Sequence, residues 1–359
     1  MALFGRSTPA PAPAGIRADA ARSGDIDDYV RGQIDAAGPG LAMSVIADGN
    51  VVHLAGYGMA DVAEGVAVAP DTIFHLASCG KQLTALGLQM LAEQGRLSLD
   101  DAIGKFIPQL AGFGPGVTLR TLLHHTSGIR DLYDESGVDE VLARNAQPTN
   151  ADVIRTFAEL GCPMAEPGLK PGDVFAYSNS GYELLGSVIE IVSGQSYHDF
   201  FARRVFQPLG MKDTFSVPDA RVGDARCAVG YRLDDRGELE EAGGTEFDAL
   251  IGSGSFYTTA PDLCLYEQAL RRYALVSEAS MEEAFTSGET NDGEETNYGF
   301  GWYFGDQDGI LFADHEGEWD GFRSYICYCL DRPLSMFLLS NHPELDLVEI
   351  ANVATDAYR

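Results

Sequence analysis

The chain has 359 residues, of which 45% are hydrophobic and 22% are charged, so it is long enough for one large domain or two lobes. Asp and Glu total 54 against 24 Lys and Arg, which gives a formal net charge of -30. A surface this acidic repels phosphate backbones and anionic membranes, so we expect neither a nucleic acid nor a membrane as partner. The acidic residues are explained either by a simply solvated surface or by a cationic substrate.

The first 22 residues predict a flexible tail, because "TPAPAPAG" is typical of an extended segment. They lack the continuous apolar core of a secretory signal, and we find no run of about 18 apolar residues that would span a membrane. The cysteines form no C-x-x-C pair, which favours buried thiols in a reducing compartment: Cys79, Cys162, Cys227, Cys264, Cys327 and Cys329. We therefore expect a cytoplasmic protein without metal or cofactor.

The first elements in chain order are a helix and a hairpin. Apolar residues at helical spacing predict a helix over 24–37, and two apolar runs flank Asp48-Gly49-Asn50, a strong turn signal. The segment after Ser78 predicts a helix that stops near Gly95. Residues 118–126 predict a short helix that Thr118 is suited to cap.

The middle of the chain is helical in pattern, and its last part is strand-like. Helices are predicted near 150–160, 181–193, 196–206 and 261–272, the last with Pro261 and Asp262 in its first turn. Strands are predicted over 298–305, 309–315, 321–330 and 334–341, and an amphipathic helix over 344–358.

This order predicts an α+β fold, in which the first hairpin and the last strands form one antiparallel sheet with the terminal helices packed on it. We expect a single domain over 23–359. Its sheet lobe comprises about 23–75 and 285–359, and its mainly helical lobe about 79–284. An active site is expected in the cleft between the lobes.

Ser78 and Lys81 are the first chemical signal, because Lys81 is one of only four lysines and follows a serine by three residues. On a helix these positions share a face, with side chains about 5–6 Å apart. The helix N-terminus stabilises an alkoxide on the serine and, together with burial, disfavours the protonated lysine. The pair therefore predicts a nucleophile and its general base, a known catalytic signature. By itself, the spacing also fits a helix-capping serine and an exposed lysine.

Two further motifs narrow the interpretation. Tyr177-Ser178-Asn179 is the only Tyr-x-Asn in the chain, and His315-Glu316-Gly317 is the only His-x-Gly. Together with "RLSLDDAIGKFIPQL" and "HTSGIRDLYD", they resemble the serine β-lactamase and penicillin-binding-protein superfamily. More narrowly, they resemble its class C β-lactamase-like branch, which includes D-aminopeptidases, D-alanyl-D-alanine carboxypeptidases, esterases and transacylases. The resemblance covers about residues 24–358 and implies the β-lactamase/transpeptidase-like fold.

The resemblance also implies roles for single residues. Ser78 would be the nucleophile, with Lys81 beside it, and Tyr177 would share the proton transfer, best as a phenolate favoured by a nearby cation. Asn179 would hold Lys81 and a substrate amide. The backbone N–H groups of Ser78 and Glu318 would form the oxyanion hole, and Gly317 would let an edge strand approach the substrate.

The third motif departs from the family pattern, because His315 stands where β-lactamases usually carry lysine. A histidine is a poorer fixed cation, which lowers the case for a β-lactam or a C-terminal carboxylate as substrate. Glu316, Glu318 and Asp320 add acid that would welcome a free amino group. Arg323 either neutralises this cluster or binds a substrate carboxylate.

Several residues have structural alternatives. Asn179 is suited to cap a helix, Cys79 is more simply a small buried residue than a nucleophile, and His124 and His125 are interpreted as packing residues. The segment 252–263, rich in Gly and Ser, predicts a turn and a helix start that could border the site.

The sequence thus predicts a serine hydrolase that cleaves ester or amide bonds of a small molecule or short peptide, including D-amino-acid peptides, through a Ser78 acyl-enzyme. Two alternatives stay open: an acyltransferase that forms amides or esters in biosynthesis, and a non-catalytic binding relative of the fold. The oligomeric state and the identities of the acyl and leaving groups are not determined by these patterns.

Overall fold

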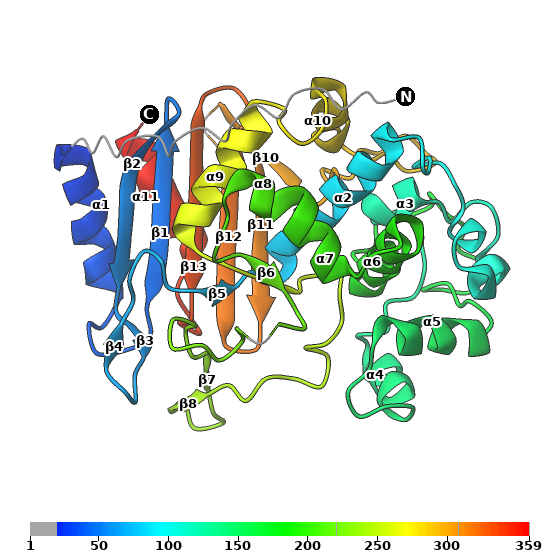
Figure 1. Cartoon of the computed structure of the whole chain (residues 1–359), viewed down its shortest axis with the longest axis horizontal. Helices are drawn as coiled ribbons and strands as arrows, with labels where there is room; N and C mark the ends of the chain where they lie inside the picture. The colour runs from blue at the N-terminus through cyan, green and yellow to red at the C-terminus, as the bar shows by residue number, and fades with distance from the viewer. Residues whose placement is uncertain (1–19, 220, 308, 359) are drawn as a thin grey trace.

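The computed structural model describes residues 20–219, 221–307 and 309–358. Its centre is a six-stranded antiparallel sheet in the order β10-β11-β12-β13-β1-β2 (Figure 1). The strands are β1 Leu41–Ala47, β2 Asn50–Tyr57, β10 Tyr303–Gln307, β11 Ile310–Trp319, β12 Phe322–Cys329 and β13 Leu334–Ser340. Strand β1 pairs with β13, so the two ends of the chain complete one sheet, as predicted.

Three smaller sheets lie outside the central one. Two of them have two strands each: β3 Met59–Asp61 pairs with β4 Val66–Ala67, and β7 Tyr231–Leu233 pairs with β8 Leu239–Glu241. The third has three strands, β5 Phe74–His75, β9 Phe256–Thr258 and β6 Phe215–Ser216, in the order β5-β9-β6. The β5-β9-β6 sheet matters most for function, because the chain leaves β5 directly into the segment that carries Ser78.

The helices of the described segments include the predicted ones and three that the sequence patterns missed, α4, α8 and α10. Their bounds are α1 Ala20–Gln33, α2 Lys81–Glu93, α3 Leu119–Leu123, α4 Glu135–Leu142, α5 Asn150–Glu159, α6 Asn179–Ser193, α7 Tyr197–Phe201, α8 Gln207–Leu209, α9 Ala260–Arg271, α10 Glu278–Ala284 and α11 Leu347–Ala357. Shorter turns are η1 Ala77–Gly80, η2 Ile103–Lys105, η3 Pro108–Phe113 and the π-helical η4 Ala202–Phe206. None of the helices within the described part of the chain combines the length and the apolar character needed to cross a membrane.

The two faces of the central sheet bury different cores. On one face, Ile26 and Val30 of α1 and Ile350 of α11 pack with sheet residues such as Val45 and Leu338. The other face contributes to a larger core shared with α2, α6 and α9. Figure 1 shows the sheet on one side of the molecule and helices α2 to α7 on the other. This arrangement confirms the predicted α+β fold with the terminal helices on the sheet.

Local chain geometry explains several elements. Asp48 and Gly49 both have positive φ, 49° and 73°, which is the tight two-residue turn that the Asp-Gly signal predicts between β1 and β2. Thr118 accepts a hydrogen bond from the Thr121 N–H and caps α3, as expected. Thr259 caps α9, with Pro261 and Asp262 in the first turn.

Two predicted boundaries need correction. Residues 1–19 of the predicted tail lie outside the described residues, and residues 20–22 belong to α1, which ends at Gln33 rather than at residue 37. The strand predicted over 298–305 begins only at Tyr303. Gly301, with φ of 81°, turns the chain against the start of α2, where an added Cβ would lie 2.5 Å from the Gln82 nitrogen. The close approach interrupts the extended pattern.

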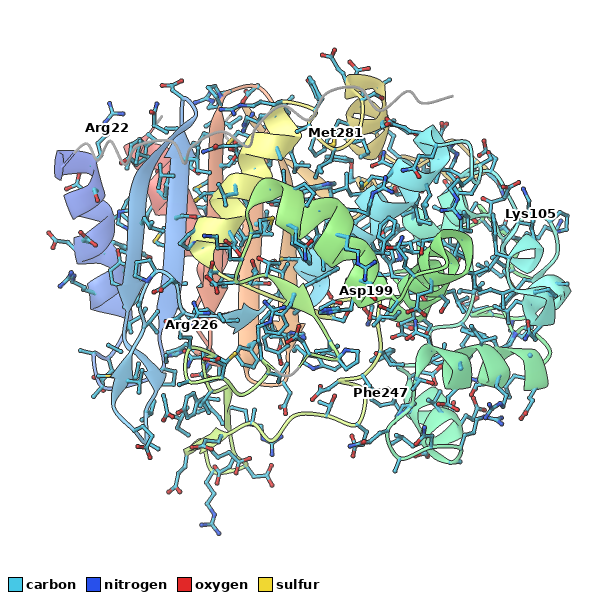
Figure 2. All side chains as sticks on the ribbon, viewed as in Figure 1. Arg22, Lys105, Asp199, Arg226, Phe247 and Met281 are labelled. Atoms are coloured by element: carbon cyan, nitrogen blue, oxygen red, sulfur yellow. The ribbon has the colours of Figure 1, made fainter. Side chains whose placement is uncertain are left out.

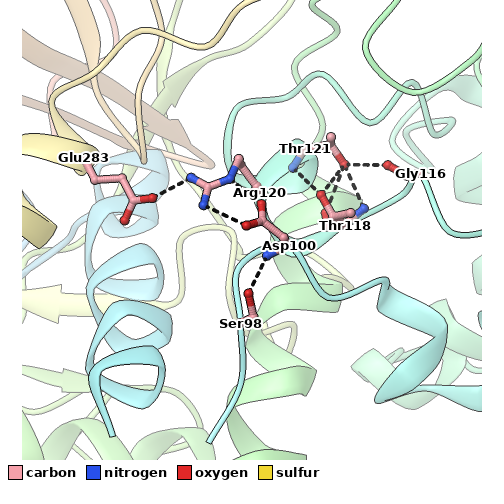
Figure 3. A network of polar contacts seen from close by, with 7 residues as sticks. All are labelled: Ser98, Asp100, Gly116, Thr118, Arg120, Thr121 and Glu283. Carbon is pink, nitrogen blue, oxygen red and sulfur yellow. Dashed lines mark hydrogen bonds and ion pairs between the residues drawn. The ribbon is translucent and has the colours of Figure 1, made fainter. Parts of the chain in front are cut away.

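An exposed ion-pair network joins three distant segments around α3 (Figure 3). The Arg120 guanidinium donates to Asp100 at 2.7 Å and to Glu283 of α10 at 2.6 Å. The Arg120 side chain is about one third exposed, so each pair contributes modestly to stability, while the bridge fixes α3 against α10.

Asn341 closes the junction between the two ends of the chain. Its buried side chain accepts from the Gly40 N–H at 2.7 Å and donates to the carbonyls of Ala60 at 3.1 Å and Val229 at 2.8 Å. Each partner lies more than 100 residues away, so a single amide ties together the start of β1, the end of β13, strand β3 and the loop before β7.

We expect Asn341→Ala to lower the free energy of unfolding by about 3 kcal/mol, because it leaves several buried backbone groups without partners. Urea denaturation measures the change. Asn352→Ala on α11 is the matched control and should change the free energy of unfolding by less than about 0.5 kcal/mol. Equal effects of the two substitutions would contradict the role assigned to Asn341.

Candidate active site

Ser78 lies on a turn that the backbone reaches through a strained residue. Ala77 has φ of 49°, an uncommon conformation for a residue with a Cβ, and it redirects the chain from β5 into η1. Gly254 permits this turn, since an added Cβ there would lie 2.8 Å from the Ala77 carbonyl carbon. The turn places Ser78 in η1, three residues before the first residue of α2.

Lys81, the first residue of α2, is fully buried beneath Ser78. Its Nζ lies 3.0 Å from Ser78 Oγ, 2.7 Å from Asn179 Oδ1 and 2.7 Å from the Ser253 carbonyl oxygen. Burial lowers the pKa of Lys81 to about 7, although Asp131 and Glu183 oppose the shift from a greater distance. Near neutral pH, both the amine and the ammonium are therefore populated.

The hydrogen bonds of Lys81 orient its lone pair. A neutral amine has two N–H bonds, and the Asn179 and Ser253 oxygens accept hydrogen bonds only. When these two oxygens take both N–H bonds, the lone pair faces Ser78 Oγ. This geometry lets the amine accept the serine proton at the moment Oγ attacks.

Tyr177 and Asn179 reach the site from the N-terminus of α6. Ser178, rather than Asn179, caps this helix by accepting from the Gly181 N–H at 3.0 Å, so the capping alternative for Asn179 is wrong. Asp131 accepts from the Ser180 N–H at 3.0 Å, which places a carboxylate at the positive end of the helix. Asn179 is thereby free to hold Lys81.

The Tyr177 ring lies directly over the lysine, with Lys81 Nζ 4.8 Å from its centroid. Burial raises the pKa of Tyr177 well above its usual value, although a hydrogen bond with Ser78 opposes the shift. The resting group is thus a phenol rather than the expected phenolate, because burial outweighs the hydrogen bond with Ser78. His125 packs on Tyr177 with centroids 4.3 Å apart and accepts from the Ser178 N–H, so its packing role fixes this segment.

His315 is buried on β11, with its ring centroid 6.1 Å from that of Tyr177. Its Nδ1–H donates to the Glu316 carbonyl, which leaves Nε2 to accept from the Tyr298 hydroxyl at 3.1 Å. Burial, and secondarily Lys81, lowers the pKa of His315 to about 3. The imidazole is neutral, so the site lacks the fixed cation that a lysine would supply there.

Gly317 lies on the part of β11 that β10 leaves unpaired. Strand β11 lies inside the sheet, but β10 pairs only with residues 310–314, so Gly317 is at a local edge. An added Cβ at Gly317 would lie 2.3 Å from Ser324 Oγ and 2.7 Å from the Leu76 carbonyl oxygen. The glycine therefore admits the backbone before Ser78, and its expected role toward a substrate stays a prediction.

Arg323 lies opposite Glu318 across β11 and β12, and the two side chains form an ion pair at 3.7 Å. Of the two open roles for Arg323, neutralisation of the acidic cluster is the one that this contact supports. Asp320 lies near Arg232 at 3.4 Å instead.

Two cavities meet at Ser78. The first, here called the aromatic chamber, is lined by His75, Ala77, Ser78, Tyr133, Asn179, Phe247, Asp248, Leu250, Ser253, Gly254, Ser255, Glu318 and Trp319. The second, the acidic groove, is lined by Ser78, Tyr177, Tyr303, His315, Glu316, Gly317, Glu318, Arg323, Ser324, Glu344, Leu345, Asp346, Leu347 and Val348. The two linings share Ser78 and Glu318, the residues whose N–H groups were expected to hold an oxyanion.

The sequence patterns missed most of the chamber. Tyr133 lies within the motif "HTSGIRDLYD", which indicated the family but no role for this tyrosine. Phe247 lies on the loop between β8 and β9 (Figure 2). Ser253 and its neighbours do border the site, as one interpretation of segment 252–263 held. Glu183 is buried near Lys81, accepts from the Tyr133 hydroxyl at 2.7 Å and has a pKa raised by burial to about 8. The sequence signal that could have indicated Glu183 is its position one helical turn after Asn179 on α6.

Cys79 is not a competing nucleophile. It is fully buried, its thiol donates to the His315 carbonyl at 2.9 Å, and burial raises its pKa to about 12. All six cysteines are free thiols. Among residues 20–219, 221–307 and 309–358, no group of three or more His, Cys, Asp or Glu is arranged to hold a metal ion.

Known proteins resemble the chain over most of its length. Penicillin-binding protein 4* of Bacillus subtilis is 32% identical over 309 residues, 82% of this chain. The octameric penicillin-binding protein homologue from Pyrococcus abyssi superposes with a TM-score of 0.80 at 29% identity, covering 93% of this chain and 76% of that one. D-amino acid amidase from Ochrobactrum anthropi SV3, solved with L-phenylalanine amide, shares the fold with a TM-score of 0.75 at 23% identity, over 94% of this chain and 97% of that one.

The chain spans 66% of the length of penicillin-binding protein 4* and 59% of that of protein flp of Staphylococcus aureus, so it corresponds to part of these relatives. The family model described as Beta-lactamase matches residues 26–357, which is nearly the whole of the described chain. With the Ser-Lys, Tyr-x-Asn and His-x-Gly motifs gathered at one site, the chain belongs to the beta-lactamase family.

Proposed function

We propose that this protein is a serine hydrolase that cleaves ester or amide bonds of a small molecule or short peptide, including D-amino-acid peptides, through a Ser78 acyl-enzyme. The proposal rests mainly on the buried Lys81. Its Nζ lies 3.0 Å from Ser78 Oγ, and burial lowers its pKa to about 7. The fold shared with a D-amino acid amidase supports the same class of reaction.

Acylation begins when neutral Lys81 accepts the Ser78 proton and Oγ bonds to the substrate carbonyl carbon. The carbonyl oxygen becomes an oxyanion that the backbone N–H groups of Ser78 and Glu318 stabilise, each typically by ~3 kcal/mol. The bond to the leaving group then breaks. Tyr177, a phenol in the resting site, gives its proton to the leaving group and regains one from the Lys81 ammonium.

The meeting of the two cavities at Ser78 supports separate places for the two halves of the substrate. A carbonyl held between Ser78 and Glu318 has one substituent directed to each cavity. Tyr177 lines the acidic groove, so the group that needs its proton leaves from there. The acyl group consequently occupies the aromatic chamber. Water that enters the emptied groove attacks the acyl carbonyl and gives its proton to neutral Lys81, which returns a proton to Ser78 Oγ as the bond between Oγ and the acyl carbon breaks.

Acyl transfer is the second candidate, and the charge of the groove favours it for amine acceptors. Glu316, Glu318, Glu344 and Asp346 line the groove, whose one arginine, Arg323, pairs with Glu318. Such a groove attracts leaving groups and acceptors that carry amines. The ordered nucleophile and base argue against the third alternative, a non-catalytic binding protein. Free thiols support a cytoplasmic location, which stays a proposal.

A fluorophosphonate probe should add covalently to Ser78, because the probe mimics the carbonyl under attack and Lys81 activates Oγ. Intact-mass spectrometry should show one adduct on the wild type and none on Ser78→Ala. Ser136→Ala, at an exposed serine, is the matched control and should label normally. A wild-type protein that forms no adduct would refute the proposed function.

The rate of this labelling should rise as pH increases through about 7, because only the neutral amine of Lys81 accepts a proton and its fraction grows above its pKa. An uncharged probe, followed over roughly pH 5 to 9, isolates this ionisation. A flat profile, or a midpoint near the ordinary lysine value, would contradict the assignment of Lys81 as the base.

Tyr177→Phe should lower kcat for an amide substrate by about 100-fold or more, since an amide leaving group needs a proton. Hydrolysis of an activated aryl ester, whose leaving group departs unprotonated, should fall much less.

Added amines such as glycinamide should divert the acyl group if transfer operates, which product analysis by mass spectrometry detects. Strict hydrolysis at every amine concentration would exclude the transfer alternative.

A further inference from the structure

The aromatic chamber offers ring surface rather than free polar groups. The Tyr133 hydroxyl donates to Glu183 at 2.7 Å, and the Trp319 Nε1–H donates to Asp248 at 2.7 Å. The ring centroid of Tyr133 lies 5.2 Å from that of Phe247 and 6.4 Å from that of Trp319. With both polar tips engaged by carboxyl groups, these side chains present three aromatic rings around one space.

The charges that line the chamber are negative. Asp248 and Glu318 contribute carboxylates, and the lining residues within the described segments include no lysine or arginine. Glu318 is paired with Arg323, but Asp248 makes no ion pair with a lysine or arginine among the described residues. His75 is buried, which lowers its pKa to about 4 and leaves it neutral. Lys81 points instead at Ser78, Asn179 and Ser253.

We propose that the aromatic chamber is a cation-binding subsite, in which Tyr133, Phe247, Trp319 and the Asp248 carboxylate select an acyl group that ends in a quaternary or protonated alkylammonium. Aromatic rings attract a cation through their negatively charged faces, and quaternary ammonium ligands are typically held by such rings. The chamber's volume of about 60 Å³, space for roughly four waters, accommodates one compact cationic head group.

This inference rests on the proposed function for its assignment of the acyl side, but the cation site itself can be tested without catalysis. An anionic acyl group would meet the unpaired Asp248 carboxylate. A neutral apolar group would gain contact with the rings but nothing from Asp248. The distinguishing observable is therefore the preference for a cation over a neutral molecule of the same shape.

Choline and its carbon isostere, in which a quaternary carbon replaces the nitrogen, form the matched pair of probes. The chain has two tryptophans, of which Trp302 is buried against Phe285 and Tyr328 while Trp319 lines the chamber. Choline should perturb the tryptophan fluorescence and bind at least about tenfold more tightly than the isostere. The fluorescence response should disappear in Trp319→Phe.

Asp248→Asn keeps one acceptor oxygen for the Trp319 N–H and the Thr245 hydroxyl, but it removes the charge and the acceptor of the Thr245 N–H. It should weaken choline binding by about tenfold and leave binding of the isostere unchanged. Asp235→Asn, at an exposed acid on the turn between β7 and β8, is the control and should change neither. Equal binding of choline and the isostere to the wild type, or unchanged choline binding by Asp248→Asn, overturns the proposal.

The corresponding substrates are aryl esters of a γ-trimethylammonio acid and of its tert-butyl isostere. A cation subsite on the acyl side gives a higher kcat/KM for the charged ester, and Asp248→Asn should abolish that preference. Choline binding with equal kcat/KM for the two esters would overturn the acyl-side assignment. If Ser78 takes no fluorophosphonate while choline still binds in the expected way, the proposed function fails and the cation site stands.

Discussion

The site depends on a single buried amine that touches no carboxylate. Lys81 is surrounded by three neutral acceptors, so no contact ion pair holds its proton, and burial brings its pKa to about 7. A carboxylate in contact would keep the ammonium and remove the base. Without the Asp131 carboxylate nearby, burial would lower the pKa of Lys81 further, and the amine could not carry a proton on to the leaving group. A carboxylate that is near Nζ but not in contact with it is what allows one residue to accept and then return a proton.

Three chain segments must converge to satisfy that amine, and small residues make the convergence possible. Gly252 has φ of 106°, and an added Cβ would lie 2.2 Å from the Tyr182 carbonyl oxygen, so the loop before β9 packs directly on α6. Two residues later, Gly254 packs against Ala77. Between them the Ser253 carbonyl reaches Lys81. The scaffold therefore delivers a backbone oxygen to the base from a loop almost 175 residues away.

The sequence could predict the parts of the site that lie in short motifs at helix starts, because Ser78, Lys81 and Tyr177 are placed by local geometry. It could not predict the Ser253 carbonyl, since a backbone oxygen has no residue type. The sequence predicted the position of His315 but not its protonation state, because its neutral form depends on burial by side chains distant in sequence. Trp319 and the rest of the chamber wall come from segments without a shared period, and only the folded chain brings them together.

The neutral third motif and the acidic groove act in the same direction on substrate choice. A substrate carboxylate beside His315 would find an uncharged imidazole, and Arg323 is already engaged by Glu318. With the leaving group in the groove as proposed, we expect the groove to disfavour leaving groups that end in a carboxylate, as those of β-lactams and C-terminal peptides do, and a net charge of -30 to add to this from long range. Salt separates the effect of the groove charges from contact with the chamber rings, because exposed charges are screened within about 10 Å at 0.1 M ionic strength, whereas a cation in direct contact with a ring face is screened less. Discrimination by the groove is consequently more sensitive to ionic strength than contact with the rings.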